Sequence, residues 1–350
     1  MAAQTISLEL MHEVLGWPKA VDVIHPAGSG TSVYASAVKQ KLECALQAFP
    51  LAANARFGVL MSDPLSSTSE PPLAIVAEFE RSVDSETLRE LQRFCWNFSH
   101  APTVITLEPS LVRVWSCCEA PNPERDISAY LVETLEARQI ESDESALLES
   151  RAAQALHWIN LVSGKFFSER ADRFSRDGRA DQMLLSNLRY MRDALADAGL
   201  HDDDICHDLL ARVIFVQFLF DRTDQDGYPA LSPVKLRRLH EDGALKQKHD
   251  SFHSVLSDYH ETYRLFDWLN SKFNGDLFPG KGETARERAI GWRSEKAAVT
   301  PEHLSLLSEF IRGDLDMPAQ QMCLWPQYAF DVIPLEFISS IYETFVTERA

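Results

Sequence analysis

Residues 74–118 read AIVAEFERSVDSETLRELQRFCWNFSHAPTVITLEPSLVRVWSCC. The stretch opens with an apolar, strand-like run and continues, after Asp84 as a candidate N-cap, into a helical repeat. Two further apolar runs follow, joined by Pro109 and Ser110, as expected for a pair of strands. A strand, a helix and a strand pair in this order predict a mixed α/β domain.

The flanking sequence extends this domain toward the N-terminus and ends it near residue 120. Residues 33–49 predict a helix and residues 56–62 (RFGVLMS) a further strand. Residues 119–126 (EAPNPERD) contain two prolines among polar neighbours, which is typical of a linker. We therefore expect an α/β domain over residues 1–120, a linker over 121–128 and an all-α domain over 129–350, an α+β protein overall. The expected helices cover 127–139, 145–167, 180–200, 204–222, 251–273, 300–313 and 334–346.

The composition describes a globular chain with a strong excess of acid. Of 350 residues, 45% are hydrophobic and 25% charged, and the net charge is −18. This charge argues against a protein whose whole surface grips nucleic acid, although a local basic face remains compatible with it. We see neither a signal peptide nor an apolar run of the ~20 residues that a membrane span needs. We therefore expect a cytoplasmic protein without a membrane partner.

Two loops have the look of ligand sites but depart from the required patterns. Gly28 and Gly30 lie in HPAGSG, between an apolar run and a helix candidate, as in loops that cradle a nucleotide or S-adenosylmethionine. His25 stands where adenine methyltransferases carry an acid, and no (N/D)PP(Y/F) tetrapeptide follows a later strand, so we expect a surface loop. In DRTDQDGYP, aligning Gly227 to the glycine of a calcium loop puts Arg222 at the first ligand position. An arginine cannot bind Ca²⁺, so the match to a calcium loop fails. No cysteine pair or histidine cluster has zinc spacing, so we expect no metal site.

Three acids near two predicted strands form the candidate catalytic site. Asp63 follows the strand at 56–62, and Glu78 and Glu80 lie late in the next strand. The order of elements resembles PD-(D/E)xK nucleases, in which an acid and an acid-x-Lys hold Mg²⁺. Here Glu80 stands in place of the lysine, and Arg81 should face the other side of the strand. We expect a degenerate, inactive nuclease-like fold, with Mg²⁺-dependent cleavage through Asp63 and Glu78 as the alternative.

Three stretches in the helical half resemble one family. LLARVIFVQFLFDR (209–222), LFDWLNSKFNGDLFP (265–279) and FDVIPLEFISSIYETF (330–345) occur in this order. They resemble the segment that precedes the catalytic domain in large adenine-specific DNA methyltransferases of restriction-modification and phage-defence systems, the single-chain type IIG kind. Three separated matches in order are more specific than one short motif.

The resemblance implies a supporting role and no catalytic residue in this chain. In the family, the third stretch leads into YYTP and the S-adenosylmethionine domain, so we expect catalysis to lie in a following domain or in a second chain. The chain itself would hold no cofactor, and its partners would be that methyltransferase domain or chain and double-stranded DNA. An interaction scaffold that recruits a methyltransferase and never touches DNA remains a further alternative, which the charge of −18 favours.

Two basic clusters are the candidates for contacting phosphates. The first comprises Lys165, Arg170, Arg173, Arg176 and Arg179, with Glu169, Asp172 and Asp177 interspersed, so a solvated face with ion pairs explains it equally well. The second comprises Lys235, Arg237 and Arg238 on a predicted short helix, with fewer acidic neighbours. We expect the aromatic residues of LFDWLNSKF to be core residues, because they recur at helical spacing.

Overall fold

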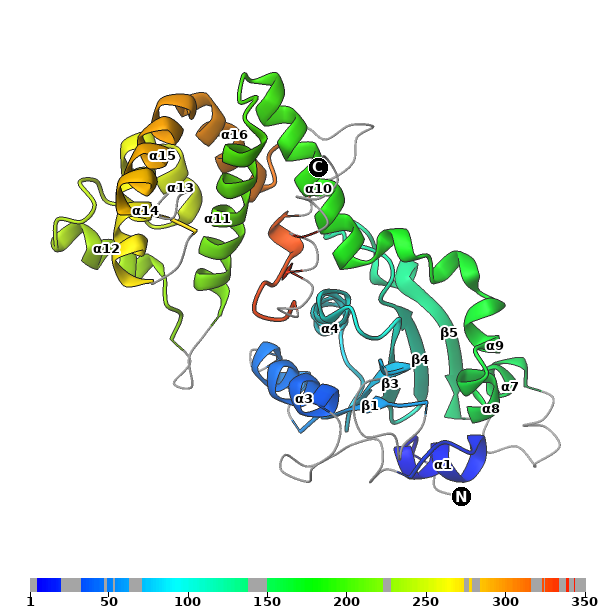
Figure 1. Cartoon of the computed structure of the whole chain (residues 1–350). Helices are drawn as coiled ribbons and strands as arrows, with labels where there is room; N and C mark the ends of the chain where they lie inside the picture. Colours follow the sequence, from blue (N-terminus) through cyan, green and yellow to red (C-terminus); the bar gives the residue numbers. More distant parts are fainter. Residues whose placement is uncertain are drawn as a thin grey trace. The chain divides into compact units, whose positions relative to one another are not determined.

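The chain folds as an α+β protein, with a mixed sheet in its N-terminal half and helices after it (Figure 1). The computed structural model describes residues 5–19, 33–46, 49–52, 54–62, 71–137, 150–222, 228–273, 277–278, 284–315, 323, 325–333, 338–339 and 343. These residues fall into two compact units, 1–182 and 183–350, which are described separately below. The helix expected over 334–346 lies almost entirely outside the described residues.

Unit 1 is built on a five-stranded sheet in the order β1-β2-β3-β4-β5. The strands are β1 (Arg56–Leu60), β2 (Ala74–Glu78), β3 (Thr103–Glu108), β4 (Leu111–Ser116) and β5 (Leu131–Glu136). Strands β2 and β3 are parallel and are connected by α4 (Ser85–Phe98), whereas the other pairs are antiparallel. Asp84 caps α4 as predicted, accepting the backbone N–H of Thr87 at 2.9 Å. The four strands and two helices expected between residues 33 and 116 are therefore confirmed.

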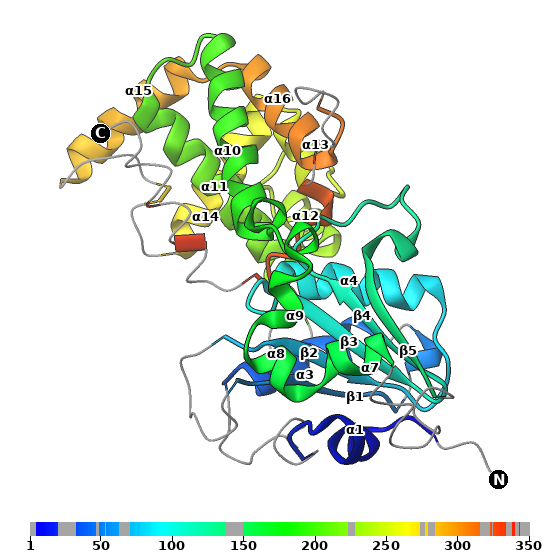
Figure 2. The same ribbon diagram turned by 90° about the vertical axis from the view of Figure 1, so that its right-hand side faces the viewer.

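Helices cover both faces of the sheet (Figure 2). On one face, α1 (Leu8–Leu15), α7 (Arg151–Leu156), α8 (Trp158–Val162) and α9 (Lys165–Ser168) pack against a core that includes Val76, Leu107 and Leu135. On the other face lie α3 (Val33–Ala45) and α4. Because side chains alternate across a strand, nearly every residue of β2 and β3 is buried by one layer or the other.

A helix was expected over 127–139, but residues 127–136 instead form a short 3₁₀ turn and strand β5. Residues 131–136 read LVETLE, whose leucines and glutamates favour a helix, but β5 pairs with the exposed edge of β4 and buries Leu135. The long helix expected over 145–167 is also wrong, because the chain is interrupted at His157 and at Gly164, whose φ is +77°. The first compact unit thus extends past the expected linker to residue 182.

Unit 2 is helical in its described part. It contains most of α10 (Ala180–Asp197) and then α11 (Asp203–Asp221), α12 (Pro233–Glu241), α13 (Phe252–Leu256), α14 (Tyr259–Lys272), α15 (Ala285–Ala298) and α16 (Pro301–Arg312). The helices expected over 180–200, 204–222 and 300–313 are confirmed, whereas 251–273 divides in two, because Asp258 caps a second helix. Helix α15 was not expected. None of the described helices combines the length and the hydrophobicity that a membrane span requires.

Candidate functional sites

Several of the sequence-based candidates lie outside the described residues. These are the loop residues Gly28 and Gly30, the first nuclease-like acid Asp63, and Gly227 of the calcium-like loop. Among the described residues, no group of three or more His, Cys, Asp or Glu side chains is arranged to hold a metal ion.

Glu78 lies at the end of β2, where it stabilises the N-terminus of a helix. Its carboxylate accepts the backbone N–H of Leu8, the first residue of α1, at 3.3 Å and forms an ion pair with Arg56 on β1. Burial raises the pKa of Glu78, and the Arg56 guanidinium and the Leu8 N–H oppose that rise. An acid at a helix N-terminus satisfies an otherwise unpaired backbone donor. The partners of Glu78 therefore give its carboxylate a structural role.

Glu80 lies two residues after Glu78, beyond the end of β2, and is exposed. Its carboxylate accepts a hydrogen bond from the side-chain amide of Asn54 at 3.3 Å. An acid here supplies no positive charge of the kind that orients a phosphate and a water in a nuclease.

The first basic cluster is largely paired with carboxylates. Arg173 donates from Nε to Glu119 at 2.9 Å and from Nη2 to the carbonyl of Ala129 at 2.6 Å. Arg170 forms an ion pair with Glu133 of β5 at 2.6 Å, and its guanidinium lies 4.4 Å from the centre of the Phe166 ring. The positive charge of both arginines is therefore compensated inside unit 1.

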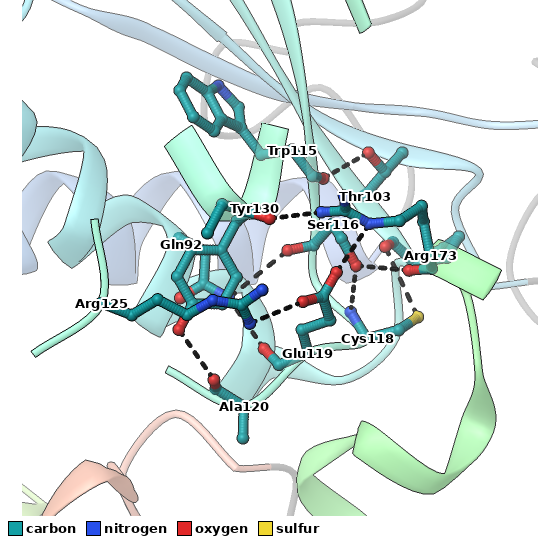
Figure 3. Close-up of polar contacts among 12 residues, drawn as sticks. Gln92, Thr103, Trp115, Ser116, Cys118, Glu119, Ala120, Arg125, Tyr130 and Arg173 are labelled. Carbon is teal, nitrogen blue, oxygen red and sulfur yellow. Dashed lines mark hydrogen bonds and ion pairs between the residues drawn. The ribbon is translucent and has the colours of Figure 1, made fainter. Parts of the chain in front are cut away.

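Glu119 is the centre of the network that holds Arg173 (Figure 3). Its carboxylate also pairs with Arg125 at 3.1 Å, and its backbone carbonyl accepts the side-chain amide of Gln92 at 3.0 Å. The Ser116 hydroxyl donates to the carbonyl of Arg173 at 2.7 Å. These contacts fasten Arg173 to the end of β4, and the first compact unit includes this segment and continues to residue 182.

The remaining members of this cluster differ in exposure. Arg179 pairs with Asp181 at 3.3 Å and donates to the carbonyl of Ser99 at 2.8 Å. Lys165 is exposed and lies 3.8 Å from the equally exposed Glu169. Arg176 is exposed and forms no ion pair within the described part of the chain. Because Lys165 and Arg179 have carboxylate partners, the expected strip of uncompensated charge is reduced to Arg176.

The second basic cluster has no carboxylate partner among the described residues. Lys235, Arg237 and Arg238 lie on the predicted short helix, now α12, whose buried face is formed by Leu236 and Leu239. The two arginines are exposed, and none of the three cations forms an ion pair with a residue that the structure describes. The ammonium group of Lys235 lies 5.5 Å from the centre of the Trp268 ring on α14.

The three stretches 209–222, 265–279 and 330–345 meet at α11. From the first stretch, Arg212 donates through Nε to the carbonyl of Leu277 in the second stretch at 2.5 Å. The Phe215 and Phe273 rings join the same two stretches edge to face, with centroids 5.4 Å apart. At the other end of α11, Asp221 accepts the backbone N–H of Phe330, which opens the third stretch, at 3.1 Å.

A buried ion pair, absent from our sequence-based expectations, completes this junction. Arg212 is fully buried and pairs with Glu295 on α15, whose side chain is 3% exposed. The Tyr263 hydroxyl donates to Glu295 at 3.2 Å, and the Arg212 guanidinium lies 4.9 Å from the centre of the Trp292 ring. Burial raises the pKa of Glu295, against the lowering effect of Arg212. The arginine of the first stretch thus organises the core of unit 2.

No protein-family model, curated protein or solved structure matches this chain.

Proposed function

We propose that this chain is the non-catalytic portion of an adenine-specific DNA methyltransferase system of the restriction-modification or phage-defence kind, acting through DNA and partner binding. The observation that carries the proposal is the convergence on α11 of the three stretches that resemble that family. Arg212 and Asp221, both from the first stretch, hold the second and third by hydrogen bonds to their backbones. If the three stretches form one structural unit of that family, they are expected to contact one another in the folded chain, as they do here.

Two features favour binding over cleavage through the nuclease-like acids. Glu78 is engaged by Arg56 and the N-terminus of α1, and Glu80 occupies the position of the usual lysine. Releasing Glu78 for Mg²⁺ would leave the Arg56 guanidinium and the Leu8 N–H without this partner. We therefore rank Mg²⁺-dependent cleavage by a PD-(D/E)xK-like fold below binding without catalysis.

The alternative is a pure scaffold, which recruits a methyltransferase and never touches DNA. A measurement must distinguish this scaffold from a chain that binds DNA directly. The charge of −18 supports it, whereas the uncompensated cations of α12 support direct contact with DNA. Both forms of the proposal expect an adenine methyltransferase, with a glycine-rich cofactor loop and an (N/D)PP(Y/F) tetrapeptide, encoded in frame with or beside this chain.

The test combines co-purification with two assays on the purified chain. We expect this chain to co-purify with the co-expressed neighbouring methyltransferase, to bind duplex DNA at low salt, and to transfer no methyl group from radiolabelled S-adenosylmethionine by itself. Binding to the methyltransferase without affinity for DNA would establish the scaffold instead. Failure to bind either one would overturn the proposal.

A further inference from the structure

Trp268 on α14 is flanked by two lysine side chains from different parts of unit 2. The ammonium groups of Lys235 on α12 and Lys272 on α14 lie 5.5 Å and 6.0 Å from the centre of the indole ring. Leu265 and Leu269, the neighbours of Trp268 on the inner face of α14, are fully buried, whereas Trp268 is half-buried. This tryptophan, which the helical spacing predicted to be core, therefore lies at the border of the core and supports surface cations.

The indole holds these lysines without cancelling their charge. A cation over an aromatic ring is attracted to the electron-rich face of the ring, yet it remains a full positive charge toward any anion that approaches. A carboxylate partner, such as Glu133 beside Arg170, removes most of that outward field. Arg238 lies three residues after Lys235 on the same side of α12 and is exposed, so it extends the cationic surface by one turn.

Two acidic residues of α14 are already engaged by other partners, whereas Glu241 and Asp242 at the C-terminal end of α12 are exposed. Glu261 is buried and accepts the backbone N–H groups of Lys246 and Gln247 at 2.7 Å and 3.0 Å. Asp267 pairs with Lys296 at 3.1 Å and accepts the indole N–H of Trp292 at 2.9 Å.

The segment that carries these lysines has a slightly positive net charge. Residues 228–273 contain seven Lys or Arg against six Asp or Glu, whereas the whole chain has 34 against 52. An anionic ligand therefore meets less repulsion at this segment than over the chain as a whole.

We infer that Lys235, Arg238, Trp268 and Lys272, named here the Trp268 patch, contact the phosphate backbone of double-stranded DNA. The inference rests on the proposed function and specifies which surface carries its DNA contact. The indole is engaged by helix packing and by two cations, which favours a role in positioning ammonium groups over stacking on a base. Contacts of this kind fix the position of a protein on DNA without reading sequence.

Salt dependence gives the inference a quantitative test. Each lysine–phosphate contact steepens the dependence of log K on log salt by about 0.9 for duplex DNA. The double variant Lys235→Gln/Lys272→Gln should therefore reduce the slope by about 1.8 and weaken binding at 0.1 M salt by roughly tenfold to sixtyfold, whatever the DNA sequence. Fluorescence anisotropy with a labelled duplex of about two helical turns measures both quantities for the full chain.

Lys246→Gln/Lys248→Gln is the matched control, because it removes two exposed lysines of the same segment outside the Trp268 patch. We expect this control to change the slope by less than half as much, and thermal melts of both variants to match the wild type. If the chain binds duplex DNA and both double variants behave alike, the patch assignment is wrong while the proposed function stands. If the wild type does not bind duplex DNA at low salt, the DNA-binding form of the proposed function fails together with this inference. Competition by poly-glutamate as effective as by duplex DNA would reassign the patch to an acidic protein partner.

Discussion

Removing Arg212 should destabilise unit 2 through the buried carboxylate that it leaves behind. In Arg212→Met, Glu295 keeps the Tyr263 hydroxyl as a donor but loses its only described ion-pair partner. Breaking one side of a buried ion pair costs about 3–5 kcal/mol, whereas replacing both sides is often nearly neutral. We therefore expect Arg212→Met to lose about that much stability at pH 7, and Arg212→Met/Glu295→Gln to recover most of it, since glutamine can still accept from Tyr263.

The pH dependence separates this cause from a simple loss of packing. Burial raises the pKa of Glu295 above 4.5, so the folded state binds more protons than the unfolded state between 4.5 and the folded pKa. Stability contributed by this group therefore falls as pH rises through that window. Without Arg212, which lowers the pKa, the window extends to higher pH. The penalty of Arg212→Met should thus be largest near pH 7 and should shrink toward pH 4.5.

Urea unfolding between pH 4.5 and 8, followed by circular dichroism, measures these changes. Arg312→Met is the matched control, because its ion pair with Asp314 is exposed on both sides and should be worth about 0.5 kcal/mol. The reasoning is refuted if Arg212→Met costs no more than this control, if its penalty is independent of pH, or if the effects of Arg212→Met and Glu295→Gln simply add.

Three further predictions concern unit 1. Asp84→Ala should lower the melting temperature at neutral pH and have a smaller effect below the folded pKa. Hydrogen bonds from Thr87 lower the pKa of Asp84 below 3.8, and the part of the stabilisation that depends on the charge disappears as pH falls through the folded pKa. Arg173→Leu should cost about 1–3 kcal/mol in urea unfolding and leave DNA affinity unchanged, because its partners are Glu119 and a backbone carbonyl; a loss of DNA affinity at unchanged stability would contradict this. Plasmid incubated with the chain and Mg²⁺ or Mn²⁺ should stay supercoiled, and Glu78→Ala should lower the melting temperature without altering that result; nicking that disappears in Glu78→Ala would revive the nuclease alternative.

The parts of the fold that the sequence predicted are those where local and tertiary preferences agree. Strands β2 and β3 are mostly apolar and buried on both faces, and α4 carries a capping aspartate, so each signal points to one structure. Strand β5 was missed because leucine and glutamate suit a helix, and the deciding factor is the free edge of β4, which no local pattern reveals.

Helix α15 was missed for a different reason. Its only buried residue among those described is Glu295, so the helix has no apolar stripe from which periodicity could identify it. The readable signal was the capping box formed by Thr284 and Glu287. The Arg212–Glu295 pair was missed for the same reason, because Glu295 lies 83 residues after Arg212 in this unexpected helix.

The candidate binding residues show the same limit, since charge on a surface depends on partners that are remote in sequence. Arg170 and Arg173 lie close together in a basic run. Their carboxylate partners, Glu133 and Glu119, lie more than 30 residues earlier in the sequence. Lys235 lies in a shorter run but meets an indole in place of an acid.

In an acidic protein this distinction has a functional consequence. A chain of net charge −18 repels DNA over most approaches, so an uncompensated basic face is attractive mainly when it is turned toward the phosphates. The surrounding negative charge then restricts the orientations in which the protein can dock, as complementary electrostatics does at other interfaces. Weak, salt-sensitive and oriented contact is what a non-catalytic portion would contribute if a methyltransferase partner reads the sequence and carries out the chemistry. A strongly basic surface would instead hold the complex on any DNA and oppose the search for its site.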